Sequence, residues 1–559
     1  MRCALCKIAI LIAAVSQAYS QTKAETPSSV DPSVQVDTIF AKWDHTSSPG
    51  CAVAVMQNSQ VIYERGYGMA DLDHNIPITP STVFHIASVS KQFTAAAILL
   101  LVGEGKLSLD DDIRKYVPEV PDFGTKITLR DLLHHVSGLR DQWELLGLGG
   151  WRVYQDLITD DDVLSLVARQ KALNFSPGSR YMYSNTGYTL LAQVIKRVSG
   201  RSLREYTSAN LFQPLGMEQT HFRDDHAEIV KNIAYGYDLG SNGTFRLSVP
   251  NTDTVGATNL LTTVEDLAKW DSNFYRPLVG GPAFTEQMLH HDKLNDGEAN
   301  DYAFGLMTGT YKGLPIVDHS GADAGYRADL LRFPEQHFSA AILCNLSATD
   351  PSDLTRKIAD IYLAKSLKEQ PKHDPVQLSG EPLSRWTGLF RKSDEDIFLR
   401  ISLKDGSLWL NTHGIFLEME PVSDSRFYLK NSFGSPLELV FTQENAPAGA
   451  KLTTRNGGAR PLVFERVATF EPSEKDLVEY AGSYVSEEID PIYRVSIEGG
   501  QLVVRRPKYP PVKVEPLTRD VFAIGPGTMR FTRTSENKIS GFLLNTDQTK
   551  NLKFSKREK

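Results

Sequence analysis

The sequence predicts an α+β domain followed by two small all-β, barrel-like modules. The first observation is that apolar strands stand near both ends of residues 34–368 while helical patterns fill the middle. Such an order is typical of a sheet assembled from both ends of a segment around a helical insert. The second is a polar, proline-containing linker at 369–382, and the third is a pattern of short strands and turns that occurs twice after it.

Residues 1–20 have the pattern of a secretory signal peptide. Arg2 and Lys7 precede a short apolar core, and Ala18 and Ser20 are small residues that suit a cleavage site. The apolar core is too short to span a bilayer, and no later segment reaches about 18 unbroken apolar residues. We therefore expect a periplasmic or secreted protein with no membrane span after removal of the signal.

The strands and helices of residues 34–368 follow one another in a readable order. A hairpin is predicted at 50–71, where two apolar strands flank the polar turn Asn58-Ser59. A long apolar, alanine-rich helix follows at 84–105. Further helices are predicted at 127–139, 159–170, 188–207 and 262–275, and strands return at 313–322, 326–336 and 338–346.

The region after the linker contains an internal repeat. Its matching segments are "LSRWTGLF" (383–390) with "LVEYAGSY" (477–484) and "ISLKDGSLWL" (401–410) with "VSIEGGQLVV" (495–504), both at an offset of 94. Because a repeat of this size is one structural unit, we expect two copies of one β-module, at 383–468 and at 469–559.

Length and charge limit the class of protein. The chain has 559 residues, which is too long for one ordinary core, and its formal net charge is -8. No basic patch of the kind that binds nucleic acid is evident, so nucleic acid is not an expected partner.

Cysteines and histidines give no sign of a metal or cofactor site. Of four cysteines, Cys3 and Cys6 lie in the signal, and Cys51 with Cys344 are too few for a disulfide scaffold. The sequence is compatible with one disulfide bridge between them and with two buried thiols. The histidine pairs at 134–135 and 290–291 are adjacent in sequence and would point in different directions on a helix, so no metal and no cofactor are expected.

The long apolar helix begins with Ser88 and carries Lys91 one turn later. Residues three apart share a helix face, so the Lys91 amine could take the proton of the Ser88 hydroxyl, and the helix dipole would favour an alkoxide there. In the alternative interpretation Ser88 or Ser90 only caps the helix. Ser-x-x-Lys also occurs at 20–23 and 535–538, but only Ser88 opens a long apolar helix.

Two further motifs each occur once. Tyr183-Ser184-Asn185 precedes a helix, and His319-Ser320-Gly321 ends an apolar strand. Taken alone, the first could be a packed aromatic residue with a helix cap, and the second a turn at a strand end.

In this order the three motifs resemble those of the serine β-lactamase and penicillin-binding protein superfamily. The resemblance is greatest to its class C β-lactamase, DD-peptidase, D-aminopeptidase and esterase branch, and flanking segments such as "FSPGSRYMYSNTGY" and "HSGADAGYRADLLRFPE" strengthen it. It covers about residues 34–365. It implies a β-lactamase-like antiparallel sheet with a helical domain, in which the helix of Ser88 is central and buried.

The resemblance also implies catalytic roles. Ser88 would attack a carbonyl carbon to form an acyl-enzyme, and Lys91 and Tyr183 would share the proton transfers. Tyr183 would act as a phenolate-like base and then as an acid toward the leaving group.

Four residues form the implied substrate-binding set. Asn185 would hydrogen-bond Lys91 or the substrate amide, and His319 would line the opposite wall. Gly321 belongs to the third motif, and the residue after it, Ala322, would supply one oxyanion-hole N–H together with Ser88.

The implied function is hydrolysis of an amide or ester. Dedicated β-lactamases usually have Lys where this chain has His319, so the motif favours a peptidase or esterase. The two β-modules are similar to the D-aminopeptidase arrangement. We expect an exported serine hydrolase of the D-aminopeptidase or DD-peptidase type, acting on amide bonds of small or D-amino-acid-containing peptides, with esters, β-lactams and peptidoglycan fragments as further substrates.

Two alternatives stay open beside this hypothesis. A carboxylesterase or weak β-lactamase would use the same three catalytic residues. A penicillin-binding sensor would be acylated without turnover.

The family fold has two further implications. It sets the strands of Cys51 and Cys344 side by side and antiparallel, so that a disulfide could form. In D-aminopeptidases a β-module reaches the active site, and the turn-rich segment 453–461 could supply such a loop. On that hypothesis a chain ending near Lys368 still acylates at Ser88 but discriminates less between small and bulky substrates.

Overall fold

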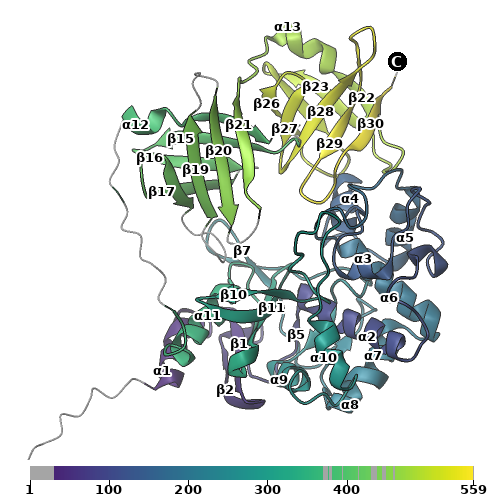
Figure 1. Cartoon of the computed structure of the whole chain (residues 1–559), viewed down its shortest axis with the longest axis vertical. Coiled ribbons are helices and arrows are strands. Elements are labelled where there is room, and N and C mark those ends of the chain that lie inside the picture. The colour runs from purple at the N-terminus through teal and green to yellow at the C-terminus, as the bar shows by residue number, and fades with distance from the viewer. Residues whose placement is uncertain are drawn as a thin grey trace, which may run out of the picture.

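The computed structural model describes residues 31–368, 376, 381–392, 395–412, 415–429, 437–443, 449–456 and 460–557. The predicted signal peptide and most of the predicted linker lie outside this part of the chain. Figure 1 shows a mixed helical and stranded body with two β-modules beside each other above it. Within the described residues no helix has both the length and the apolar character needed to cross a bilayer.

A six-stranded antiparallel sheet forms the centre of the first body. The strand order is β10-β11-β12-β13-β1-β2. The bounds are β1 Cys51–Gln57, β2 Gln60–Tyr67, β10 Met307–Tyr311, β11 Leu314–Asp323, β12 Tyr326–Phe333 and β13 Phe338–Cys344. Since β1 pairs with β13, the two ends of the domain meet in mid-sheet, which confirms the predicted assembly.

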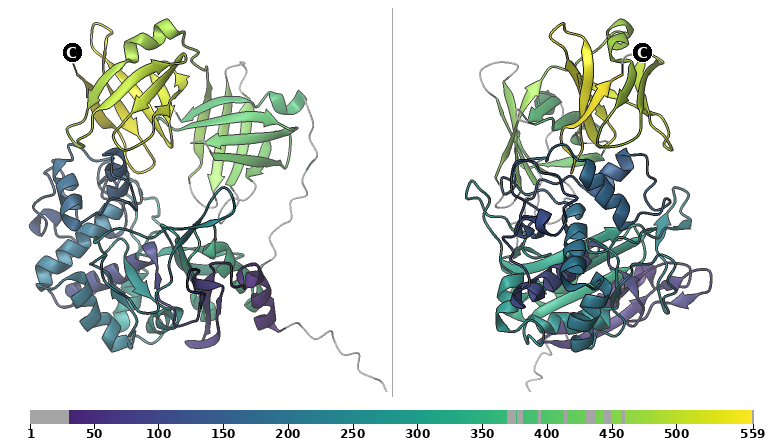
Figure 2. Two further views of the ribbon diagram at one scale, coloured as in Figure 1. Left: turned by 180° about the vertical axis from the view of Figure 1, so that it is seen from behind. Right: turned by 90° about the vertical axis from the view of Figure 1, so that its right-hand side faces the viewer.

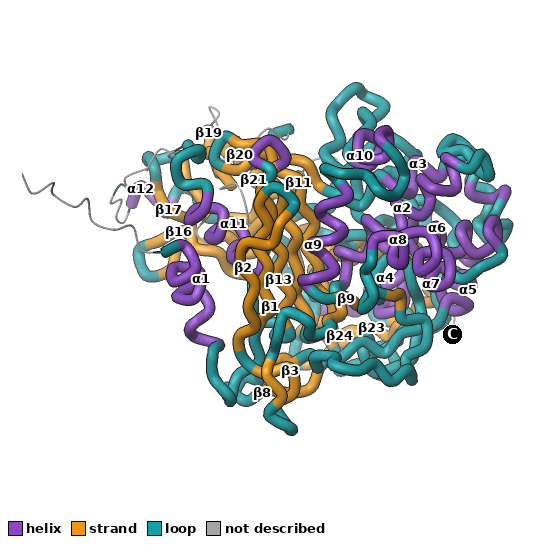
Figure 3. Tube along the Cα trace, turned by 90° about the horizontal axis from the view of Figure 1, so that it is seen from below, coloured by secondary structure: helices purple, strands orange, loops and turns teal. Residues whose placement is uncertain are grey.

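Helices cover both faces of this sheet. On one face α1 (Pro32–Phe40) and α11 (Pro351–Tyr362) pack together, and α9 (Val264–Asn273) lies on the other (Figure 3). Beyond α9 lies the helical region, with α2 Lys91–Gly103, α3 Leu129–Leu133, α4 Gln142–Leu148, α5 Asp160–Arg169, α6 Asn185–Ser199, α7 Leu203–Thr207, α8 Gln213–Leu215 and α10 Pro282–Met288. Short strands join the two regions: β3 Met69–Asp71, β4 Ile76–Pro77, β5 Phe84–His85, β6 His221–Phe222, β7 Tyr237–Leu239, β8 Phe245–Leu247 and β9 Leu260–Thr262.

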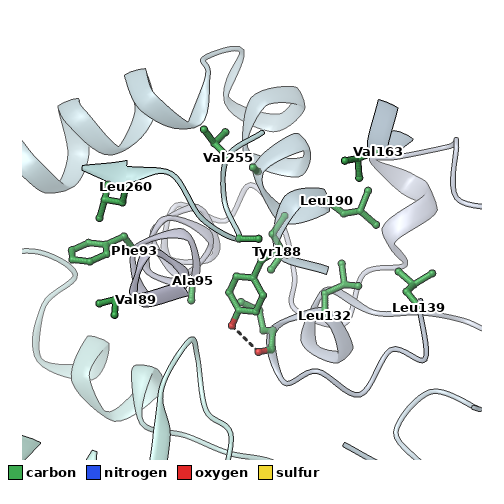
Figure 4. Close-up of a cluster of buried hydrophobic side chains, with 14 of the residues drawn as sticks. Val89, Phe93, Ala95, Leu132, Leu139, Val163, Tyr188, Leu190, Val255 and Leu260 are labelled. Atoms are coloured by element: carbon green, nitrogen blue, oxygen red, sulfur yellow. Dashed lines mark hydrogen bonds between the residues drawn. The ribbon is translucent and has the colours of Figure 1, made fainter. Parts of the chain in front are cut away.

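Helix α2 is buried on almost every side, as predicted for the central helix. Phe93 and Ala95 are completely buried and pack among side chains that include Tyr188 and Leu260 (Figure 4). The alanines of α2 leave room for α6 to approach it closely. An apolar helix of this kind buries its whole surface while its first turn stays free to face a cleft.

A disulfide joins Cys51 and Cys344. The two residues face each other directly in the β1–β13 ladder, although 293 positions separate them in sequence. Of the two outcomes that the sequence left open, the structure therefore has the bridge.

The two C-terminal modules are both built of consecutive antiparallel strands. The first is a closed barrel of β14 Gly388–Lys392, β15 Phe398–Lys404, β16 Ser407–Thr412, β17 Ile415–Pro421, β18 Arg426–Leu429, β19 Leu437–Gln443, β20 Ala450–Asn456 and β21 Leu462–Val467. The second is a nine-stranded sheet in the order β25-β24-β23-β22-β30-β29-β28-β27-β26. Its bounds are β22 Gly482–Val485, β23 Tyr493–Glu498, β24 Gln501–Arg505, β25 Val512–Lys513, β26 Glu515–Thr518, β27 Val521–Ile524, β28 Gly527–Arg533, β29 Ile539–Asn545 and β30 Leu552–Lys556.

The sequence repeat corresponds to equivalent structure in the two modules. Each module opens with a short helix, α12 (Glu381–Ser384) or α13 (Glu474–Leu477), and its first strand starts at a glycine. Gly388 and Gly482 are separated by the repeat offset and have φ values of 142° and 153°. Because side chains rarely adopt such φ values, both copies need glycine at this position.

Candidate active site

Ser88 lies in a 3₁₀ turn, Ala87–Ser90, that leads directly into α2. Ala87 has a φ of 49°, an uncommon conformation for a residue with a side chain. Ser90 holds the turn, because its hydroxyl donates to the Ala87 carbonyl at 2.5 Å and accepts from the Leu260 N–H at 3.1 Å. Neither serine makes a capping hydrogen bond to α2, so the helix-cap interpretation is wrong.

Lys91 is buried and donates hydrogen bonds to three acceptors. Its Nζ donates to Ser88 Oγ at 3.1 Å, to Asn185 Oδ1 at 2.8 Å and to the Ala257 carbonyl at 2.7 Å. Burial lowers the pKa of Lys91 to about 7. At neutral pH a large share of this amine is therefore uncharged and able to accept a proton.

Asp141 fixes the orientation of Asn185. The backbone N–H and the Nδ2–H of Asn185 both donate to Asp141 Oδ2, at 2.7 and 2.8 Å. The Asn185 carbonyl oxygen must then point toward Lys91. Asp141 also caps α4 by accepting from the N–H groups of Trp143 and Glu144. Sequence reasoning missed this residue, although an aspartate before an apolar helical pattern is a cap signal.

Tyr183 lines the same cavity as Ser88. Its ring packs on His135 with 4.2 Å between centroids, and Lys91 Nζ lies 4.7 Å from the centre of the Tyr183 ring. Burial raises the pKa of Tyr183 well above its ordinary value. This shift favours the protonated phenol in the free protein, and the base role that the resemblance implies for Tyr183 stays a prediction.

His319 is a buried, neutral imidazole. Its Nδ1 donates to the Ser320 carbonyl at 2.6 Å, so its Nε2 accepts from the Tyr302 hydroxyl at 2.9 Å. Burial, with the nearby Lys91 charge, lowers the pKa of His319 to about 3. His319 is not among the described residues that line the cavity at Ser88, and its expected place on the opposite wall stays a prediction.

Strand β11 brings the third motif to the nucleophile. Strand β10 pairs only with residues 314–318 of β11, which leaves the edge of 319–323 open toward the turn of Ser88. A Cβ at Gly321 would overlap the Ile86 carbonyl oxygen and lie 3.1 Å from the Ser88 nitrogen. Only glycine permits this approach, and it puts Ala322 at the cavity as expected.

A cavity of about 250 Å³ opens onto these residues. Its lining contains the expected Ser88, Tyr183, Asn185 and Ala322. The remaining described residues that line it are Trp143, Val153, Tyr154, Ile158, Pro250, Asn251, Thr252, Thr258 and Asp323.

The adjacent histidines have structural contacts. His134 Nδ1 is hydrogen-bonded to the Tyr302 carbonyl at 2.8 Å, and His135 Nδ1 accepts from the Ser184 N–H at 3.1 Å. The two histidines therefore have separate partners and do not form a shared pair of metal ligands. In the part of the chain that is described, the group with metal-ligand spacing is Asp225, His226 and Asp253, none of which lines the cavity at Ser88.

The second β-module contacts the segment that carries Asp141. The Gln548 N–H donates to Glu144 Oε1 at 3.1 Å, and the Gln548 carbonyl accepts from the Asp141 N–H at 3.4 Å. Beside them Arg140 and Glu488 form a buried ion pair. Figure 2 shows this module seated directly above the helical region. The second β-module therefore packs against the segment 140–144, whose Asp141 orients Asn185.

The loop that was expected to reach the active site contacts another part of the catalytic domain. Segment 453–461 lies partly outside the described residues, and its Arg460 pairs with Glu298 at 3.5 Å. Among the described residues of both modules none lines the cavity at Ser88.

Comparison with known families agrees with this geometry. Residues 36–365 match the family described as Beta-lactamase. The chain belongs to the beta-lactamase family. All three motifs fall inside the matched span, and this beta-lactamase-family protein is a serine hydrolase.

Similar proteins extend over the C-terminal modules. A D-aminopeptidase of Brucella melitensis is 27% identical over 515 residues, which covers 88% of this chain and 93% of that protein. A D-aminopeptidase of Gluconobacter oxydans is 26% identical and covers 79% of this chain and 80% of its own length. The likeness therefore includes the catalytic domain and most of the tail.

Solved structures share the fold of this beta-lactamase-family protein. The octameric penicillin-binding protein homologue from Pyrococcus abyssi covers 78% of this chain and 100% of its own, with a TM-score of 0.57 and 25% identity. The D-amino acid amidase from Ochrobactrum anthropi covers 60% of this chain and 99% of its own, with a TM-score of 0.51 and 21% identity.

Proposed function

We propose that the protein is a D-aminopeptidase that releases N-terminal residues from small peptides through an acyl-enzyme on Ser88. The observation that carries the proposal is the buried Lys91 amine, 3.1 Å from Ser88 Oγ and with a pKa of about 7. A serine hydroxyl becomes a nucleophile when a base of matched pKa lies within hydrogen-bond reach. The similarity to D-aminopeptidases over 88% of the chain supports the substrate class.

In this mechanism Ser88 Oγ forms a bond to the carbonyl carbon and its proton passes to Lys91, directly or through the Tyr183 hydroxyl. The N–H groups of Ser88 and Ala322 stabilise the oxyanion. When the tetrahedral species collapses, the C–N bond breaks and the proton returns through Tyr183 to the departing amine. Water then attacks the acyl-enzyme by the same proton route and releases the amino acid.

The lining of the cavity favours an amide or aminopeptidase substrate over one that ends in a carboxylate. Among the described residues that line it there is no lysine or arginine, and His319 is neutral. A β-lactam or a C-terminal D-Ala-D-Ala peptide would find no fixed cation on that lining. Small peptides with D-residues, peptidoglycan fragments included, are the substrates that we propose.

We also propose that the protein acts in the periplasm or outside the cell. The signal pattern of residues 1–20 supports export, and the Cys51–Cys344 disulfide is of a kind that persists in oxidising compartments.

Ser88→Ala tests the proposal. D- and L-alanyl p-nitroanilides, D-Ala-D-Ala peptides and p-nitrophenyl esters are offered to the wild type and the variant, and both are labelled with a fluorophosphonate probe. The wild type should turn over the D-alanyl amide and Ser88→Ala should lose both turnover and labelling. Ser535→Ala is the matched control, because Ser535 has the same Ser-x-x-Lys spacing on the surface and should behave as wild type.

Each other outcome names a different function. Labelling that persists in Ser88→Ala refutes the nucleophile. Turnover of esters without amides supports the carboxylesterase, and acylation without steady-state turnover supports the sensor.

A further inference from the structure

One carboxylate faces the cavity at Ser88. Asp323 is the last residue of β11, and among the described residues that line the cavity it alone is aspartate, glutamate, lysine or arginine. None of the implied catalytic roles uses it. A charged group in a small cavity beside a nucleophile is a strong candidate for substrate recognition.

The Asp323 carboxylate is held by hydrogen-bond donors. Its Oδ2 accepts from His85 Nε2 at 3.0 Å and from Thr258 Oγ1 at 2.9 Å, and Tyr154 lines the same cavity. Burial would raise the pKa of Asp323, but the donors outweigh burial and hold it below the ordinary value. When its imidazole is protonated, His85 forms an ion pair with Asp323, and among the described residues no lysine or arginine pairs with this carboxylate.

Strand geometry places this carboxylate on the face of β11 that meets the turn of Ser88. Side chains two apart point to the same face of a strand, so Asp323 shares a face with Gly321, whose Cβ position lies 3.1 Å from the Ser88 nitrogen. In an aminoacyl group the α-nitrogen is about 2.5 Å from the carbonyl carbon, given ordinary bond lengths and angles. An acceptor for that nitrogen must therefore lie beside the nucleophile, as Asp323 does.

We propose that the Asp323 carboxylate binds the protonated α-amino group of the residue whose carbonyl Ser88 attacks. The site then selects substrates with a free amino end and disfavours those that lack it. This inference rests on the proposed function and names its specificity.

Tyr154 lines the cavity together with Asp323. Its φ of 69° is strained for an aromatic residue, and its ring also lines a second cavity of about 430 Å³ that shares Asn251 and Thr252 with the first. A larger group on the substrate nitrogen would therefore meet Tyr154 or enter the second cavity. An N-acetyl group should be disfavoured because it removes the positive charge that Asp323 binds.

The test compares three p-nitroanilides that differ only at the α-carbon: D-alanyl, N-acetyl-D-alanyl and propionyl, the last lacking the amino group. Wild type should prefer D-alanyl over propionyl by about 10- to 100-fold in kcat/KM, the effect of a hydrogen bond to a charged group. Asp323→Asn keeps the shape and removes the charge, and should reduce this preference by a similar factor, chiefly through KM. Asp238→Asn, an exposed carboxylate on β7, is the control and should keep the wild-type ratio.

The outcomes separate this inference from the proposed function. If Asp323→Asn cleaves D-alanyl p-nitroanilide with the wild-type preference, the inference is overturned and the D-aminopeptidase proposal stands. If the wild type cleaves esters but no aminoacyl amide, the proposed function fails, and inhibition of ester hydrolysis by D-alaninamide against propionamide decides the amine subsite. If Asp323→Asn does not fold, the three-substrate comparison on the wild type still decides, because equal rates on D-alanyl and propionyl substrates would overturn the inference.

Discussion

The ion pair between Arg140 and Glu488 should be essential for docking the second β-module. Arg140 is fully buried and the Glu488 side chain is 5% exposed. Burial raises the pKa of Glu488 and lowers that of Arg140, because it disfavours the charged form of each side chain. The opposite charge of the partner compensates for this cost. Glu488→Gln would remove the anion and leave the guanidinium buried without its partner.

The expected cost follows from this burial. Removing one partner of a buried pair costs about 3–5 kcal/mol, whereas an exposed pair contributes about 0–1 kcal/mol. Asp490 provides the matched control, since it pairs with Arg169 across the same interface but is 84% exposed. Because Arg140 precedes Asp141, which orients Asn185, Glu488→Gln should also slow acylation.

Thermal unfolding and the rate of fluorophosphonate labelling measure the two effects. Glu488→Gln should melt at a clearly lower temperature than Asp490→Asn and should label more slowly. The double variant with Arg140→Met and Glu488→Leu should recover part of the stability, because no charge is then buried. Equal melting temperatures and equal labelling rates for the two single variants would refute the argument.

The pH dependence of acylation should follow the titration of Lys91. Because its pKa is about 7, the fraction of neutral, proton-accepting amine increases as the pH rises through 7, and kcat/KM should rise between pH 6 and 8. A flat profile would exclude Lys91 as the base. Tyr183→Phe should reduce turnover by about 10²-fold or more if the phenol relays protons to and from Ser88, and a variant as fast as wild type would leave Tyr183 a packing residue. Replacing Cys51 and Cys344 by alanine should lower the free energy of unfolding by up to about 6 kcal/mol in the chain-entropy account of a closed loop. Calorimetry measures that loss, and alkylation of both wild-type cysteines without reductant would contradict the bridge.

The sequence predicted those contacts that depend on short-range spacing. Ser88 and Lys91 lie one turn apart, so their proximity follows from helical geometry. The burial of the helix was readable from its continuous apolar composition.

Contacts between distant segments were beyond such reasoning. Asp141 is 44 positions from Asn185, and Arg140 is 348 positions from Glu488, so no local pattern reveals either pair. The hydrogen bond of His319 with Tyr302, 17 positions earlier, is likewise not evident from the His-x-Gly motif. The protonated state of Tyr183 likewise results from burial, which depends on the complete fold.

The disulfide has a topological consequence for resistance to proteolysis. It closes residues 51–344 into one covalent ring, and every residue of the catalytic site, from Ser88 to Asp323, lies within it. A protease that cuts any single loop of this ring leaves both fragments tethered, with the nucleophile and the strand beside it on one molecule. The β-modules lie outside the ring, so after one cut between Cys344 and the first module only non-covalent contacts, such as the Arg140–Glu488 ion pair, hold them on the catalytic domain.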